Sequence, residues 1–269
     1  AVGAAIAAKF LAHRLGWVMS QTIYAYISDG GIQEEISQGA GRIAGHLGLD
    51  NLIMYYDANN IQLSTTVEEV DSEDVAAKYK AWGWHVIEIN GCCPEAIRKA
   101  LREAKATVGQ PTLIIGKTIM GRGAVGPNGE NYENRVNTHG QPLSAAGASI
   151  EATIKNLGGD PEAPFQIFPD VQELYAARLQ ELRELAKARK QEEKTWREEN
   201  PDRASKLDRW FAGEAPAVDW KSIEQKPNQA TRAASATVLS ALAEQVENMI
   251  VASADLSNSD KTDGFLKKT

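Results

Sequence analysis

Between Thr22 and Thr118, short runs of β-branched and aromatic residues alternate with longer segments of helical periodicity. The short runs are apolar at consecutive positions, as expected for strands of a parallel sheet that is covered on both faces. The pattern predicts strands over 22–27, 52–56, 85–89 and 112–115, and helices over 32–47, 73–82 and 94–106. The predicted fold class is therefore α/β, an open, doubly wound parallel sheet.

The first domain is predicted to extend over residues 1–157. It opens on a mostly apolar amphipathic helix and contains, at 121–144, a segment rich in Gly, Asn and Pro. Such a long stretch without periodicity is usually a functional or mobile loop. A helix over 145–157, followed by Gly158 and Gly159, is predicted to end the domain.

The remainder of the chain predicts a linker and the start of a second domain. The linker, 158–227, includes a highly charged helix at 171–199, whose charges are most simply a solvated face. A second α/β unit is expected over 228–269, with a helix through Val246 and a strand over 249–252. One helix and one strand do not make a stable domain, so this unit is expected to be incomplete.

Composition narrows the possible functions. The chain has 29 Lys and Arg against 36 Asp and Glu, a net charge of −7 that argues against nucleic acid as the main partner. No run of residues is long and apolar enough for a membrane span, and no basic leader precedes the apolar start. The two cysteines, Cys92 and Cys93, are adjacent, which favours structural thiols in a reducing cytoplasm.

Candidate chemistry lies where two predicted strands end. Asp29 follows the first strand and precedes Gly30 and Gly31, whereas Asn59 follows the second strand, 30 residues later. If the strands are neighbours, both side chains reach the same sheet edge, where α/β proteins bind ligands. A carboxylate, an amide oxygen and a backbone carbonyl suit Mg²⁺, and glycines before a helix suit phosphate. The segment predicts a metal-bridged diphosphate, although an ordinary turn with a helix cap would have a similar sequence.

The same residues resemble the thiamine-diphosphate motif of transketolases. The matching segments are Ser28-Asp29-Gly30 with Asp57-Ala58-Asn59-Asn60, then Gly116-Lys117-Thr118-Ile119-Met120-Gly121, Thr138-His139-Gly140-Gln141-Pro142-Leu143, and Ala230-Thr231-Arg232 with Ser253-Ala254-Asp255-Leu256. The resemblance extends over essentially the whole chain. It implies a thiamine-diphosphate-binding fold, with 1–157 as the diphosphate-binding domain lacking its first part and 228–269 as the start of the pyrimidine-binding domain.

The resemblance also implies a role for each matching residue. Asp29, the Asn59 side chain and the Ile61 carbonyl would hold Mg²⁺ or Ca²⁺, and Gly30 and Asn59 would touch the diphosphate. His139 would be catalytic, contacting both the diphosphate and the hydroxyls of the donor sugar. Arg232 and Ser259 would hold the sugar phosphate, where the planar fork of Arg suits phosphate oxygens. The implied activity is transfer of a two-carbon ketol group between sugar phosphates.

Departures from the family pattern limit these expectations. Ser28 replaces the first glycine of the motif, so either its φ is ordinary or cofactor affinity is reduced. The glutamate that activates the cofactor is not in this sequence, so the chain alone is expected to be inactive. A homodimer or a complementary chain is implied. Alternatives are dihydroxyacetone synthase, 1-deoxyxylulose-5-phosphate synthase, or a non-catalytic cofactor-binding subunit.

Overall fold

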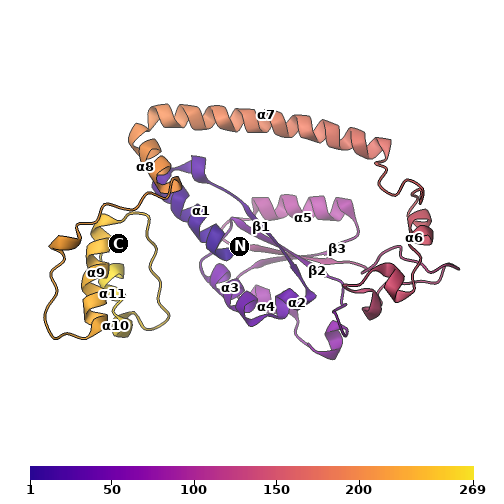
Figure 1. The fold of residues 1–269 in the computed structure, drawn as a ribbon, viewed down its shortest axis with the longest axis horizontal. Helices are drawn as coiled ribbons and strands as arrows, with labels where there is room; N and C mark the ends of the chain where they lie inside the picture. The colour runs from indigo at the N-terminus through magenta and orange to yellow at the C-terminus, as the bar shows by residue number, and fades with distance from the viewer. The chain divides into compact units, whose positions relative to one another are not determined.

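The computed structural model describes residues 1–269, which form two compact units, Ala1–Glu193 and Lys194–Thr269 (Figure 1). The first unit contains the only sheet, so it defines the α/β class of the protein. Helix α7 (Pro169–Glu199) begins in the first unit and ends in the second. None of the helices is both long and apolar enough to cross a membrane.

The sheet has four parallel strands in the order β1-β2-β4-β3: β1 (Ile23–Ser28), β2 (Leu52–Ala58), β4 (Thr112–Lys117) and β3 (His85–Asn90). The chain moves across the sheet from β1 to β3 and then returns to place β4 beside β2. Connections between parallel strands are right-handed. The helix that connects β3 to β4 must therefore lie on the opposite face of the sheet from the helices that connect β1 to β2 and β2 to β3. The predicted doubly wound sheet is confirmed.

Each face of the sheet has its own apolar core. Helices α1 (Val2–Leu15), α3 (Glu35–His46) and α4 (Val75–Ala81) cover one face, and α5 (Pro94–Ala106) covers the other (Figure 1). Buried residues of the first core include Leu52, Met54, Tyr56, Tyr79, Trp84 and Leu113. The second core is smaller and contains Ile53, Ala100, Ala104 and Ile114. Alternate residues of β2 and β4 therefore point into different cores, which explains their continuous apolar sequences.

Strand β1 is covered on one face only, whereas the sequence predicts strands that are covered on both faces. The side chains of β1 alternate between half-buried and exposed, and Tyr24 and Tyr26 are 56% and 68% exposed. Most contacts of α5 are with β3 and β4, which lie on the other side of the sheet from β1. The edge strand is thus covered by the first core only.

Two predicted helices of the first unit are shorter or divided. The segment 32–47 forms α2 (Asp29–Gln33) and α3, separated at the extended backbone of Glu34, where the side chain of Gln38 donates to the Gln33 carbonyl. The segment 145–157 forms a single 3₁₀ turn, Leu143–Ala146, and α6 (Ile150–Asn156). Gly147, with a φ of 94°, separates them, because a left-handed residue ends a helix.

The second unit is helical. It contains α8 (Pro201–Phe211), α9 (Thr231–Gln245), α10 (Ser257–Asp260) and α11 (Asp263–Leu266), with α11 packed on α9. The strand predicted over 249–252 is wrong, because these residues have no regular structure. A strand requires a neighbour for its backbone hydrogen bonds, and the unit supplies none.

Candidate functional site

Asp29 is the first residue after β1, and its carboxylate is buried at the carboxyl edge of the sheet. Only 3% of the residue is exposed. The Tyr56 hydroxyl donates to Oδ1 at 2.6 Å, and the backbone N–H groups of Asn59 and Asn60 donate to Oδ2 at 3.1 Å each. The register of β1 and β2 explains why these groups are close together. Ser28 of β1 is opposite Asp57 of β2, so the chain segments that follow the two strands lie side by side. The predicted proximity of Asp29 and Asn59 is confirmed.

The loop after β2 folds around this carboxylate. The Asn59 side chain accepts a hydrogen bond from the Ile61 N–H at 3.0 Å, and Asn60 has a φ of 66°. This left-handed conformation suits Asn better than most other residues. Burial, followed by the hydrogen bond to Asp29, raises the pKa of Tyr56, so its hydroxyl stays protonated and donating.

The oxygen atoms at this edge suit a hard divalent cation. Asp29 supplies a carboxylate, Asn59 an amide oxygen, and the Ile61 carbonyl accepts no backbone hydrogen bond. No group of three or more His, Cys, Asp or Glu side chains is placed to hold a metal. A cation here would therefore have few protein ligands, as Mg²⁺ does when substrate phosphates complete its shell.

The turn after β1 leaves room for such a phosphate. A side chain at Gly30 would meet no atom within 4 Å, so the backbone is open to a ligand there. Ser28 has φ −101° and ψ 176°, an extended conformation that any residue adopts, so serine causes no strain at the first motif position. The expected phosphate-binding helix, however, is only the five-residue α2, which limits its dipole.

His139 lies on the long loop that follows β4. Two hydrogen bonds join distant parts of this loop: the Met120 N–H donates to the Asn134 side chain, and the Asn134 N–H donates to the Met120 carbonyl. The next residue, Gly140, packs against Leu63 of the loop that follows Asn59. The Nδ1 atom of His139 is buried without a partner, as is the Nε2 atom of Gln62. A buried ring nitrogen without a partner is available for a hydrogen bond to a ligand.

A second polar cluster, which the sequence did not reveal, lies beside Asn59 on the other face of the sheet. Asp57 accepts hydrogen bonds from the Tyr26 hydroxyl at 2.5 Å and from the Thr118 hydroxyl. Desolvation of the hydroxyl and its bond to Asp57 raise the pKa of Tyr26 to about 12. These residues and Asn59 line a cavity of about 640 Å³. The alternation of β1 and β2 could have indicated that Tyr26 and Asp57 share a face.

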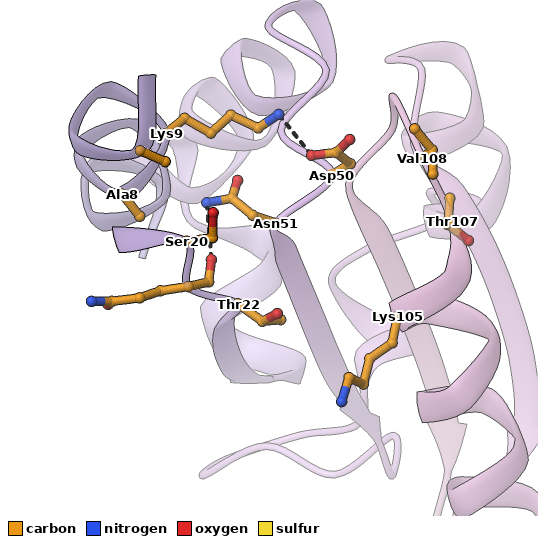
Figure 2. A pocket seen from close by; sticks show the side chains of 11 residues that line it. Ala8, Lys9, Ser20, Thr22, Asp50, Asn51, Lys105, Thr107 and Val108 are labelled. Carbon is orange, nitrogen blue, oxygen red and sulfur yellow. Dashed lines mark hydrogen bonds and ion pairs between the residues drawn. The ribbon is translucent and has the colours of Figure 1, made fainter. Parts of the chain in front are cut away.

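A different cavity, of about 460 Å³, lies at the opposite edge of the sheet (Figure 2). It is lined by residues before β1 and β2 and at the end of α5, including Thr22, Asn51 and Lys105. Lys9 reaches Asp50 at 2.7 Å, so this charge is already paired (Figure 2). Ligands of parallel sheets bind at the carboxyl edge, and Asp29 lies there rather than at this cavity.

The predicted phosphate-binding residues belong to the second unit. Arg232 is exposed in the first turn of α9, and Ser259 is exposed in α10. Asp255 is exposed in the turn before α10. The first unit contains the other predicted site residues, Asp29, Asn59, Ile61 and His139. The phosphate-binding role of Arg232 and Ser259 stays a prediction.

The parallel sheet defines an α/β protein with a buried carboxylate at a strand tip, next to an asparagine loop and an open Gly30, at the edge where such proteins bind ligands. The family described as "Transketolase, thiamine diphosphate binding domain" matches residues 1–216. The chain belongs to this family, and its fold and the thiamine diphosphate-binding character of residues 1–216 follow from that membership.

Similarity to individual relatives agrees with this assignment. The chain is 36% identical to Transketolase-1, chloroplastic, from Arabidopsis thaliana and to Transketolase 2 from Xanthobacter flavus, with 97% of the chain covered in each case. Among solved structures, transketolase from Leishmania mexicana superimposes with a TM-score of 0.86 at 30% identity over 97% of the chain. The chain spans only 36% and 39% of the two relatives' sequences and 39% of that structure.

Proposed function

We propose that this chain is the cofactor-anchoring part of a transketolase, in which Asp29, Asn59 and the Ile61 carbonyl hold a divalent cation, Mg²⁺ or Ca²⁺, against thiamine diphosphate. The observation that carries the proposal is the closure of the Asn59–Asn60 backbone onto the buried carboxylate of Asp29. This closure supports the proposal, because the three oxygen ligands would then come from adjoining segments at one sheet edge. Gly30 leaves the space in which diphosphate oxygens would complete the shell.

The residues of this chain supply position and charge to the reaction. When bound, thiamine diphosphate supplies the carbon nucleophile and the electron sink for ketol transfer. His139, with a buried and unpaired ring nitrogen, would donate to the diphosphate or to hydroxyls of the donor sugar. Arg232 and Ser259 would hold the sugar phosphate.

Sugar phosphates are the proposed substrates. A transketolase from Pichia stipitis with 29% identity and a TM-score of 0.83 was solved in complex with sedoheptulose-7-phosphate. The chain covers 39% of that protein, and we expect the 269 residues to bind cofactor but to require the rest of the protein or a complementary chain for turnover. The cytoplasm is the proposed location.

A thermal-shift comparison tests the metal ligand. Ligands that bind only the folded state raise the melting temperature. Thiamine diphosphate with Mg²⁺ should raise it for the unchanged chain and for Asp50→Ala, which removes a carboxylate at the opposite sheet edge. Asp29→Ala should show no such rise. An equal rise in all three proteins would contradict the proposed role of Asp29.

A further inference from the structure

The hydrogen bonds to Asp29 use most of its capacity to accept. An ionised carboxylate offers about four lone-pair positions, two on each oxygen. The N–H groups of Asn59 and Asn60 occupy both positions on Oδ2, and the Tyr56 hydroxyl occupies one on Oδ1. A single position therefore remains, and it is on Oδ1.

Burial and strand pairing fix the position of the Tyr56 hydroxyl relative to the Asp29 carboxylate. The residue is 6% exposed and belongs to the apolar core on the α3 side of the sheet. It sits on β2 opposite Ile27, two residues before Asp29, so backbone pairing sets its height relative to the carboxylate. Its hydroxyl approaches Oδ1 at 2.6 Å, a short bond to a charged acceptor.

We propose that Tyr56 is a positioning residue, which orients the Asp29 carboxylate and leaves one lone-pair position, on Oδ1, open to the cation. This inference rests on the proposed function. Without the phenol, Oδ1 would regain a second free position and the carboxylate would lose one of its three restraints. Groups that orient metal ligands typically change metal affinity about 10- to 100-fold when they are removed.

The test compares Tyr56→Phe with Tyr79→Phe. Tyr79 is a fully buried tyrosine of the same core, and its hydroxyl has no hydrogen-bond partner. For each protein, the Mg²⁺ concentration that gives half-maximal binding of thiamine diphosphate is measured by calorimetry at a temperature where all are folded. Urea midpoints are measured in parallel to follow stability separately.

We expect Tyr56→Phe to raise the half-maximal Mg²⁺ concentration about 10-fold or more, and Tyr79→Phe to leave it unchanged. An unchanged value in Tyr56→Phe, with Mg²⁺-dependent binding in the wild-type chain, would overturn this inference alone. Absence of Mg²⁺-dependent binding in the wild-type chain would overturn the proposed function as well.

A measurement on the wild-type chain covers the case in which Tyr56→Phe does not fold. A crystal structure with Mn²⁺ and thiamine diphosphate should show the ion on Oδ1 only, with the Tyr56 hydroxyl still bonded to that oxygen. Coordination by both carboxylate oxygens, or by Oδ2, would overturn the inference.

Discussion

The backbone N–H of Asn60 donates to Oδ2 of Asp29 at 3.1 Å, although 31 residues separate them. This bond forms while Asn60 holds a φ of 66°, in the left-handed region. The tip of β2 is thereby closed over the residue that follows β1. The conformation of Asn60 is therefore a condition for the shape of the proposed cation site.

Asn60→Ala and Asn60→Gly should differ in both stability and binding. Both lose the hydrogen bond from the Asn60 side chain to Glu68, so they form a matched pair. Alanine pays about 1 kcal/mol in the left-handed region, whereas glycine does not. We expect Asn60→Ala to unfold at lower urea and to bind thiamine diphosphate with Mg²⁺ more weakly than Asn60→Gly. Equal behaviour of the two variants would show that the loop does not need this conformation.

Gly45 of α3 is predicted to tolerate no side chain. A Cβ atom there would overlap the carbonyl oxygen of Trp82, which belongs to a backbone that cannot rotate away. Gly45→Ala should destabilise the protein by about 3 kcal/mol or more, as overpacking against backbone does. Denaturant unfolding followed by tryptophan fluorescence measures this loss.

Gly39, in the same helix, is the control for Gly45. A Cβ atom at Gly39 would meet nothing within 4 Å. Gly39→Ala should therefore stabilise the chain by about 0.5–1 kcal/mol, because alanine loses less entropy in a helix. Equal losses of stability in both variants would show that the close approach of Gly45 to the Trp82 carbonyl is not the cause.

Tyr79 should make the protein sensitive to alkaline pH. Burial raises its pKa to about 12, whereas an unfolded tyrosine titrates near about 10. Between pH 10 and pH 12 the folded chain keeps the Tyr79 proton, whereas the unfolded chain releases it. The free energy of unfolding is therefore unaffected by this residue below pH 10 and falls as the pH rises toward 12. At pH 11 the loss from this residue should be roughly 1 kcal/mol relative to pH 8.

Tyr79→Phe removes that titration. The variant should be at least as stable as wild type at pH 8, since the lost hydroxyl is buried and unpaired. It should lose about 1 kcal/mol less than wild type between pH 8 and pH 11. Urea midpoints at the two pH values give the comparison, and identical losses would exclude Tyr79 as a source of the pH dependence.

The sheet could be predicted from sequence because the signals for strands and helices are local. Helix α5 begins and ends at the predicted residues, and Pro94 occupies its first position. The meeting of Asp29 and Asn59 was also predictable, since neighbouring parallel strands end at one edge. The absence of a strand at 249–252 could not be predicted, because an apolar run becomes a strand only when another strand pairs with it.

The partners of the site residues could not be predicted from spacing. That Tyr56 reaches Asp29, and Tyr26 reaches Asp57, depends on side-chain direction and on strand register. Sequence spacing alone does not give the register of two strands that are separated by a helix. The break at Glu34 was hidden because the residues on both sides of it have helical periodicity.

In the proposed site, a divalent cation links thiamine diphosphate to Asp29 and Asn59. Calorimetric titration of the unchanged 269-residue chain with thiamine diphosphate, with Mg²⁺ and then with excess EDTA, tests it most directly. We expect saturable one-to-one binding with Mg²⁺ and no measurable heat of binding with EDTA. Binding of equal strength in both buffers, or in neither, would contradict it.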